Sequence, residues 1–117
     1  MNELKLLPER RKYEELQKDR AFEIIKNLRN EVIEFAEDME KVLKENDHKH
    51  GWDEMSYHRL YTHIKTEFEE FQREYILTCH RLDGRDDAGI AKMRKEAIDI
   101  ANFCMFFCHN YPKGEYP

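Results

Sequence analysis

Two short acidic patterns in the second half of the chain could do chemistry. Glu67 and Glu70 are three residues apart, and so are Glu96 and Asp99. On helices this spacing puts both carboxylates of a pair on one face, so antiparallel packing would bring four acids together. Such a cluster repels itself unless cations neutralise it, and carboxylate oxygens suit Mg²⁺, with Mn²⁺ as a substitute. Iron is disfavoured, because a di-iron bundle would have His where this sequence has Glu70 and Asp99.

Asp99 carries the strongest part of this argument. A helical wheel puts it among the aromatic residues of its own helix. A buried carboxylate without a partner is costly, so a basic side chain, a shifted pKa or a cation must compensate it. Lys95, four residues earlier, is the simplest partner. For Glu67 and Glu70 the competing interpretation is an ordinary solvated helix face, and the sequence leaves it open.

Three helical segments must position these acids. The first is expected over residues 9–45, as one long helix or two, because apolar residues recur there at three- and four-residue spacing. The second is expected over residues 56–80, with Ser56 as its N-cap and an aromatic stripe as its buried face. The third, over residues 88–110, is apolar on nearly every side of its second half, which predicts a helix buried in a bundle.

The composition favours an all-α fold. The chain has 117 residues, of which 38% are charged, and 4 Gly and 3 Pro are few for a fold built on tight turns. We expect one all-α domain over residues 1–117, a helical hairpin with a long N-terminal helix. Residues 1–20 would form a charged N-terminal arm, and residues 49–108 carry the motifs. These helices cannot cover their own core, which predicts assembly into an oligomer of the four-helix-bundle type.

Charge and cysteine content narrow the partners and the compartment. A net charge of -5 argues against a nucleic-acid polymer or an anionic membrane as partner. No apolar stretch is long enough to span a membrane, and the charged start is unlike a secretory signal. An odd number of cysteines without such a signal predicts reduced thiols and a cytoplasmic location. The three cysteines are Cys79, Cys104 and Cys108.

Two other groups of residues are given structural rather than chemical interpretations. The cysteines lack zinc-finger spacing, so we expect them to act as small buried hydrophobes rather than zinc ligands. Four histidines are expected at the surface: His48, His50, His58 and His63. The segment 83–87 is predicted to be an exposed loop, and residues 111–117 a frayed tail.

On these residues the chain resembles the all-α nucleoside triphosphate pyrophosphohydrolases, the MazG-like and dimeric dUTPase/dCTPase superfamily. The family pattern is E-E-x-x-E followed, after a variable gap, by E-x-x-D. Glu67, Glu70, Glu96 and Asp99 occupy the matching places, whereas Thr66 stands where the family has its first acid. The resemblance covers residues 49–107.

The resemblance implies an activity. Glu67, Glu70, Glu96 and Asp99 would bind Mg²⁺, and a (d)NTP would be cleaved to a (d)NMP and pyrophosphate, which cleanses the nucleotide pool. One of these acids, or Glu74, would help to orient the attacking water. Because the helices cannot cover their own core, a homodimer or homotetramer is expected. The alternative is a non-catalytic helical module on the same scaffold that binds a nucleotide or a protein.

Four residues outside the acidic set are expected to bind the substrate. Trp52 stacks on the base or, equally well, anchors the core. Lys49 and Lys95 could contact the phosphates of the substrate. The competing interpretation is that both are ordinary surface charges. Asn102 occupies a place where members of the family have a side chain that touches the nucleotide.

Overall fold

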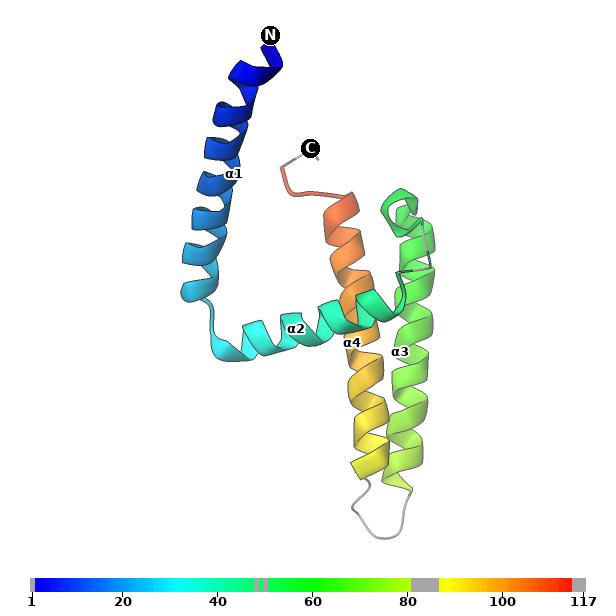
Figure 1. Ribbon diagram of the computed structural model, residues 1–117. Coiled ribbons are helices and arrows are strands. Elements are labelled where there is room, and N and C mark those ends of the chain that lie inside the picture. Colours follow the sequence, from blue (N-terminus) through cyan, green and yellow to red (C-terminus); the bar gives the residue numbers. More distant parts are fainter. Residues whose placement is uncertain (1, 48, 50, 81–86, 115–117) are drawn as a thin grey trace. The chain divides into compact units, whose positions relative to one another are not determined.

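The computed structural model describes residues 2–47, 49, 51–80 and 87–114 of the chain, with side chains from Lys12 onward (Figure 1). In these residues all regular structure is helical, which confirms the all-α prediction. The elements are α1 (Asn2–Lys26), α2 (Asn30–Glu45), the 3₁₀ helix η1 (Trp52–Glu54), α3 (Tyr57–Cys79) and α4 (Asp87–Asn110).

The first expected segment forms two helices. α1 begins at Asn2, earlier than predicted, and continues through Pro8, which lacks an N–H group but does not end the helix. α1 ends at Lys26, and the amide nitrogen of Asn27 donates a hydrogen bond to the Glu23 carbonyl at 2.9 Å. The bond gives a donor to a carbonyl in the last turn of the helix, where intrahelical N–H donors are missing.

The chain divides into two compact units between Ala36 and Glu37, so α2 belongs to both. In the first unit every described side chain except Ile33 is exposed. A domain needs a core of its own, which these residues lack within one chain. The prediction of one domain over residues 1–117 therefore stays a prediction.

In the second unit α3 and α4 pack side by side as an antiparallel hairpin (Figure 1). The buried apolar side chains of the described residues are Leu60, Ile98 and Phe106. The expected burial of the stripe on α3 is correct only in part for the single chain, since Leu60 is buried whereas Tyr61 and Phe68 are 66% and 52% exposed. The reason is that α3 packs against one long helix, which covers only one edge of the stripe.

α4 is likewise only half covered. Ile98, Asn102 and Phe106 are buried, but Phe107 is 41% exposed. The prediction that α4 is surrounded by other helices is therefore wrong for the single chain. Its apolar outer face fits a helix that has α3 as its one extensive neighbour and meets α2 and η1 only locally.

The segment before α3 is fixed to the end of α4 by side-chain hydrogen bonds. Gly51 has a φ of 97°, a left-handed conformation that favours glycine, and it leads directly into η1. The Asn110 amide nitrogen donates to the Trp52 carbonyl at 2.8 Å and to the Met55 carbonyl at 3.3 Å. The Tyr111 hydroxyl accepts a hydrogen bond from the backbone N–H of Tyr57 at 2.8 Å. These bonds hold Trp52 at the last turns of α4.

Two further predictions concern the loop and the tail. Residues 83–86 of the expected loop and residues 115–117 of the expected tail lie outside the described residues, whereas Asp87 is the first residue of α4. Within the described part of the chain, no helix has the length and apolar character needed to cross a membrane.

The N-cap of α3 provides a test of this local structure. The Ser56 hydroxyl accepts a hydrogen bond from the backbone N–H of Arg59 at 3.3 Å, as the sequence predicted. We expect Ser56→Ala to lower the free energy of unfolding by about 1 kcal/mol, because one N-terminal amide loses its acceptor. Urea denaturation measures this loss. Ser56→Asp, which keeps an acceptor, should lose much less, and an equal loss in both variants would contradict the cap.

Candidate functional site

Three of the four predicted acids converge where α3 packs on α4. Glu67 and Glu70 come from α3 and Glu96 from α4, and one carboxylate oxygen of each lies within 4.8 Å of the others. All three side chains are partly buried. Glu67 Oε2 and Glu96 Oε2 are buried without a hydrogen-bond partner among the described residues. A buried unpaired acceptor is unfavourable, so these two oxygens call for a donor or a cation.

Asp99 lies one turn beyond Glu96 on α4 and is also partly buried. Burial raises the pKa of Asp99, Glu70 raises it further, and Lys95 and Lys49 oppose the shift. Lys95, the simplest partner that the sequence offered for Asp99, forms no ion pair with it among the described residues, although its charge lowers the pKa of Asp99. In the described part of the chain the ion pair on this helix joins Arg94 to Asp38 of α2.

The convergence perturbs the acid–base chemistry of the cluster. Burial, followed by repulsion from Glu70, raises the pKa of Glu67 from 4.5 to about 7. Burial, followed by hydrogen bonding to Glu70, raises the pKa of Glu96 to about 7. Both shifts have the same physical origin, because ionised carboxylates that share a partly buried space destabilise one another. At neutral pH the cluster therefore binds protons that a cation could replace.

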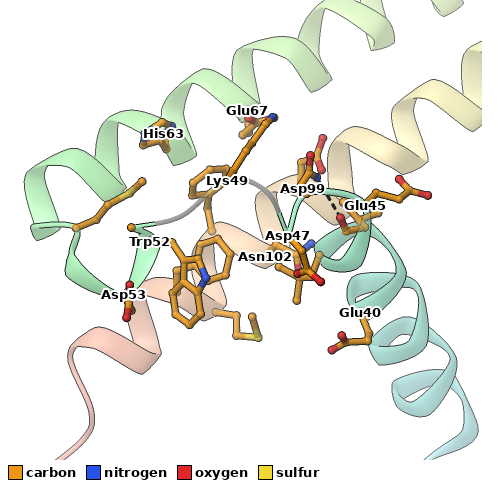
Figure 2. Close-up of a pocket in the computed structure, with 18 of the residues that line it drawn as sticks. Glu40, Glu45, Asp47, Lys49, Trp52, Asp53, His63, Glu67, Asp99 and Asn102 are labelled. Carbon is orange, nitrogen blue, oxygen red and sulfur yellow. Dashed lines mark hydrogen bonds between the residues drawn. The ribbon is translucent and has the colours of Figure 1, made fainter.

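The acids open onto a cavity of about 1070 Å³ (Figure 2). Its lining comes from the C-terminal half of α2, from residues 46, 47, 49 and 51–55, and from α3 and α4. Glu67 and Asp99 belong to its lining, so the cluster and the cavity are continuous. Small-molecule pockets typically have about 300–1,000 Å³, which makes this cavity large enough for a nucleotide.

All four residues expected to bind substrate line this cavity. Trp52 stacks on Phe106 with ring centroids 4.4 Å apart and an angle of 17° between the rings. It is thus an anchor on α4 and also part of the cavity wall. Lys49 and Lys95 are exposed and approach Asp99 closely enough to lower its pKa.

Asn102 is the most buried polar side chain among the described residues, with 4% of its surface exposed. Its amide nitrogen donates to the Met39 carbonyl of α2 at 3.4 Å. Its Oδ1 is buried and has no partner in the described part of the chain. The sequence selected this residue, but not its contact with α2.

The sequence interpretation missed several cavity residues, among them His63, Glu45 and Asp47. His63, expected at the surface, is partly buried and stacks on Phe103, with ring centroids 4.8 Å apart and an angle of 4°. Its position four residues before Glu67, on the same helix face, was a usable signal. Glu45 and Asp47 also line the cavity, but they are near a helix end where spacing carries no signal.

Neither His58 nor Glu74 belongs to the acidic cluster. His58 is exposed, as expected, whereas His48 and His50 lie outside the described residues. Glu74 is partly buried and is neither in the three-acid group nor in the cavity wall.

The cysteines do not behave as the sequence suggested. Cys79, Cys104 and Cys108 are all exposed free thiols, so their interpretation as buried hydrophobes is wrong for the single chain. Among the described residues, the one group of three or more acids, histidines or cysteines close enough to share a metal is the acidic cluster.

Comparison with protein-family models, with curated proteins and with solved structures finds no match to this chain.

The raised pKa values predict how stability depends on pH. The folded state holds protons on Glu67 and Glu96 that the unfolded chain releases near pH 4.5. This stabilisation is complete below pH 4.5 and is lost as pH rises to about 7. Two partly exposed, interacting groups do not contribute their full shifts, so we expect a loss of about 2 kcal/mol between pH 5 and 8.

Urea denaturation in a chelating buffer at a series of pH values measures this loss. Glu96→Gln should remove much of the slope, because it removes one carboxylate from the cluster. Glu69→Gln is the matched control, since Glu69 is an exposed acid of α3, the helix that carries Glu67 and Glu70. A stability that is flat or rises over this window would contradict the mutual repulsion.

Proposed function

We propose that this protein is a Mg²⁺-dependent nucleoside triphosphate pyrophosphohydrolase that cleaves a (d)NTP to a (d)NMP and pyrophosphate. The observation that carries the proposal is the juxtaposition of the acidic cluster and the large cavity. Glu67 belongs to both, so a ligand in the cavity would have its phosphates beside the carboxylates. The spacing of the same acids matches the MazG-like pattern described above.

The residues fit a hard divalent cation. Every donor in the cluster is a carboxylate oxygen, which Mg²⁺ and Mn²⁺ prefer over nitrogen or sulfur. The oxygens lie within 4.8 Å of one another, slightly more than two Mg–O bonds of about 2.1 Å. The two unpaired oxygens, Glu67 Oε2 and Glu96 Oε2, are available as ligands. Glu67, Glu70, Glu96 and Asp99 are the proposed ligands.

Charge explains why the cation is needed. A nucleoside triphosphate carries about four negative charges, and the acidic cluster would repel it. When bound, Mg²⁺ would neutralise the phosphates and activate the water that attacks between the α- and β-phosphates. Lys49 and Lys95 reach the same end of the cavity and would hold phosphate oxygens. Trp52 and Asn102 would contact the nucleoside.

One observation favours the alternative, a nucleotide-binding module without turnover. Thr66 stands where the family has its first acid, and its hydroxyl donates to the Thr62 carbonyl at 2.9 Å on the exposed side of α3. It therefore supplies neither a carboxylate nor a free hydroxyl to the cluster. Any role of the missing acid falls to another residue or is lost.

Pyrophosphate release tests the enzymatic proposal. We expect release from at least one member of a panel of NTPs and dNTPs with Mg²⁺. Glu96→Gln and Asp99→Asn should lower the rate by at least about 100-fold, because each removes a ligand charge from the metal site. Glu69→Gln, on the exposed side of α3, should keep the wild-type rate.

Metal-dependent stability separates the two candidate functions. Both predict that Mg²⁺ raises the melting temperature of the wild type and not of Glu96→Gln. Stabilisation by metal without pyrophosphate release from the whole panel would favour the binding module. Equal metal effects in both proteins would contradict the metal site itself.

We further propose that two or four copies assemble through the uncovered face of the hairpin. Four aromatic residues of α3 lie within about 40° of arc at 100° per residue and are each more than half exposed. They are Tyr57, Tyr61, Phe68 and Tyr75. An apolar stripe of this kind is unusual on a monomer and is the seam that a helical bundle buries.

Charge introduced into the stripe should dissociate the assembly. We expect the double variant Tyr61→Glu/Phe68→Glu to behave as a 14.3 kDa monomer, because buried unpaired carboxylates oppose association. Size-exclusion chromatography with light scattering measures the mass. Arg73→Glu, an exposed change away from the stripe, should leave the mass unchanged. A wild type that is monomeric at micromolar concentration would overturn the proposal.

A further inference from the structure

The orientation of the Asn102 amide is set by α2. The Met39 carbonyl can only accept a hydrogen bond, so the amide nitrogen of Asn102 must face it, as the 3.4 Å contact shows. Oδ1 is then turned away from α2. Asn102 therefore presents a fixed acceptor rather than an amide that can turn to suit either kind of ligand.

This acceptor has no partner in the described part of the chain. A buried amide oxygen without a donor is unfavourable, and native proteins rarely leave one unsatisfied. Asn102 lines the cavity, so a ligand held there can supply the missing donor. The oxygen itself is covered in the structure, so a ligand reaches it only when the side chains that cover it move.

The charge of the cavity wall favours the same kind of ligand. Seven carboxylates line the cavity against two lysines. Five of these acids lie outside the proposed metal ligands: Glu40, Glu45, Asp47, Asp53 and Glu54. Figure 2 shows four of them around the cavity, together with Trp52 and Asn102. Ionised carboxylates only accept hydrogen bonds, so this wall attracts N–H groups and repels carbonyl oxygens.

We propose that this cavity selects nucleobases that carry an exocyclic amino group, namely cytosine, adenine or guanine, with Asn102 Oδ1 accepting a hydrogen bond from that group. The inference rests on the proposed function, because it assumes that the ligand is a nucleotide. It goes beyond that function by naming the property of the base that is recognised.

Bases with a carbonyl in place of the amino group fit less well. The ring N–H of uracil is flanked by two carbonyl oxygens, which would face acceptors in the cavity wall. Replacing the amino group by an oxygen therefore exchanges a hydrogen bond for a repulsion. Sites built around one polar contact discriminate strongly against a ligand that lacks it, because the buried partner stays unpaired.

Binding of nucleoside monophosphates tests the selection without turnover, because they are products of the proposed reaction. The matched pairs CMP with UMP and AMP with IMP each differ by an amino group exchanged for an oxygen. We expect the wild type with Mg²⁺ to bind the amino member of each pair about tenfold more tightly, as one buried hydrogen bond requires. Isothermal titration calorimetry measures the four affinities.

Variants assign the selection to the Asn102 oxygen. Asn102→Leu removes the amide oxygen and should bind both members of each pair equally. Asn110→Leu is the control for loss of a buried amide, since Asn110 Oδ1 is also unpaired among the described residues but does not line the cavity. Asn110→Leu should weaken the binding of both members of each pair alike. Circular dichroism checks that each variant is folded.

The outcomes separate the inference from the proposed function. Equal affinities or an oxo preference in the wild type, with pyrophosphate release intact, would overturn the amino selection alone. A preference that survives in folded Asn102→Leu would overturn the role of Asn102. No binding of any of the four monophosphates, together with no pyrophosphate release, would overturn both proposals.

Discussion

Electrostatic repulsion between α3 and α4 is the constraint on which the hairpin depends. Packing of the two helices buries Leu60 and Ile98, and the same packing brings Glu67, Glu70 and Glu96 within 4.8 Å of one another. The helices cannot separate to relieve the charge without exposing their small core. Protons or a divalent cation must therefore neutralise the carboxylate charges that the packing of the two helices brings together. Fold stability and ligand chemistry share one set of side chains.

The sequence predicted the features that local geometry determines. The spacing of Glu96 and Asp99 fixes their common helix face wherever the helix packs, so the meeting of Glu96 with the acids of α3 followed from one assumption, an antiparallel hairpin. The cap of α3 was also predictable, because the Ser56 hydroxyl bonds to an amide only three residues away. Such contacts require no knowledge of the tertiary structure.

The features that the sequence did not predict depend on contacts between distant segments. Asn102 meets the Met39 carbonyl across 63 positions, and no periodicity encodes that meeting. His63 is partly buried because it stacks on Phe103, a residue of another helix. The sequence did not predict the exposure of Tyr61 and Phe68 for a different reason. A hydrophobic stripe shows that a helix face must be covered, but not whether the same chain or another molecule covers it.

The position of Trp52 has a practical consequence for optical spectroscopy. The chain has one tryptophan, and it lies in the cavity wall between the ring of Phe106 and the edge of His109. Its indole emission therefore reports on this wall alone, without a background from other tryptophans. A ligand that displaces water from the wall changes the polarity around the indole. The protein thus carries a built-in fluorophore at the place where its ligand is expected.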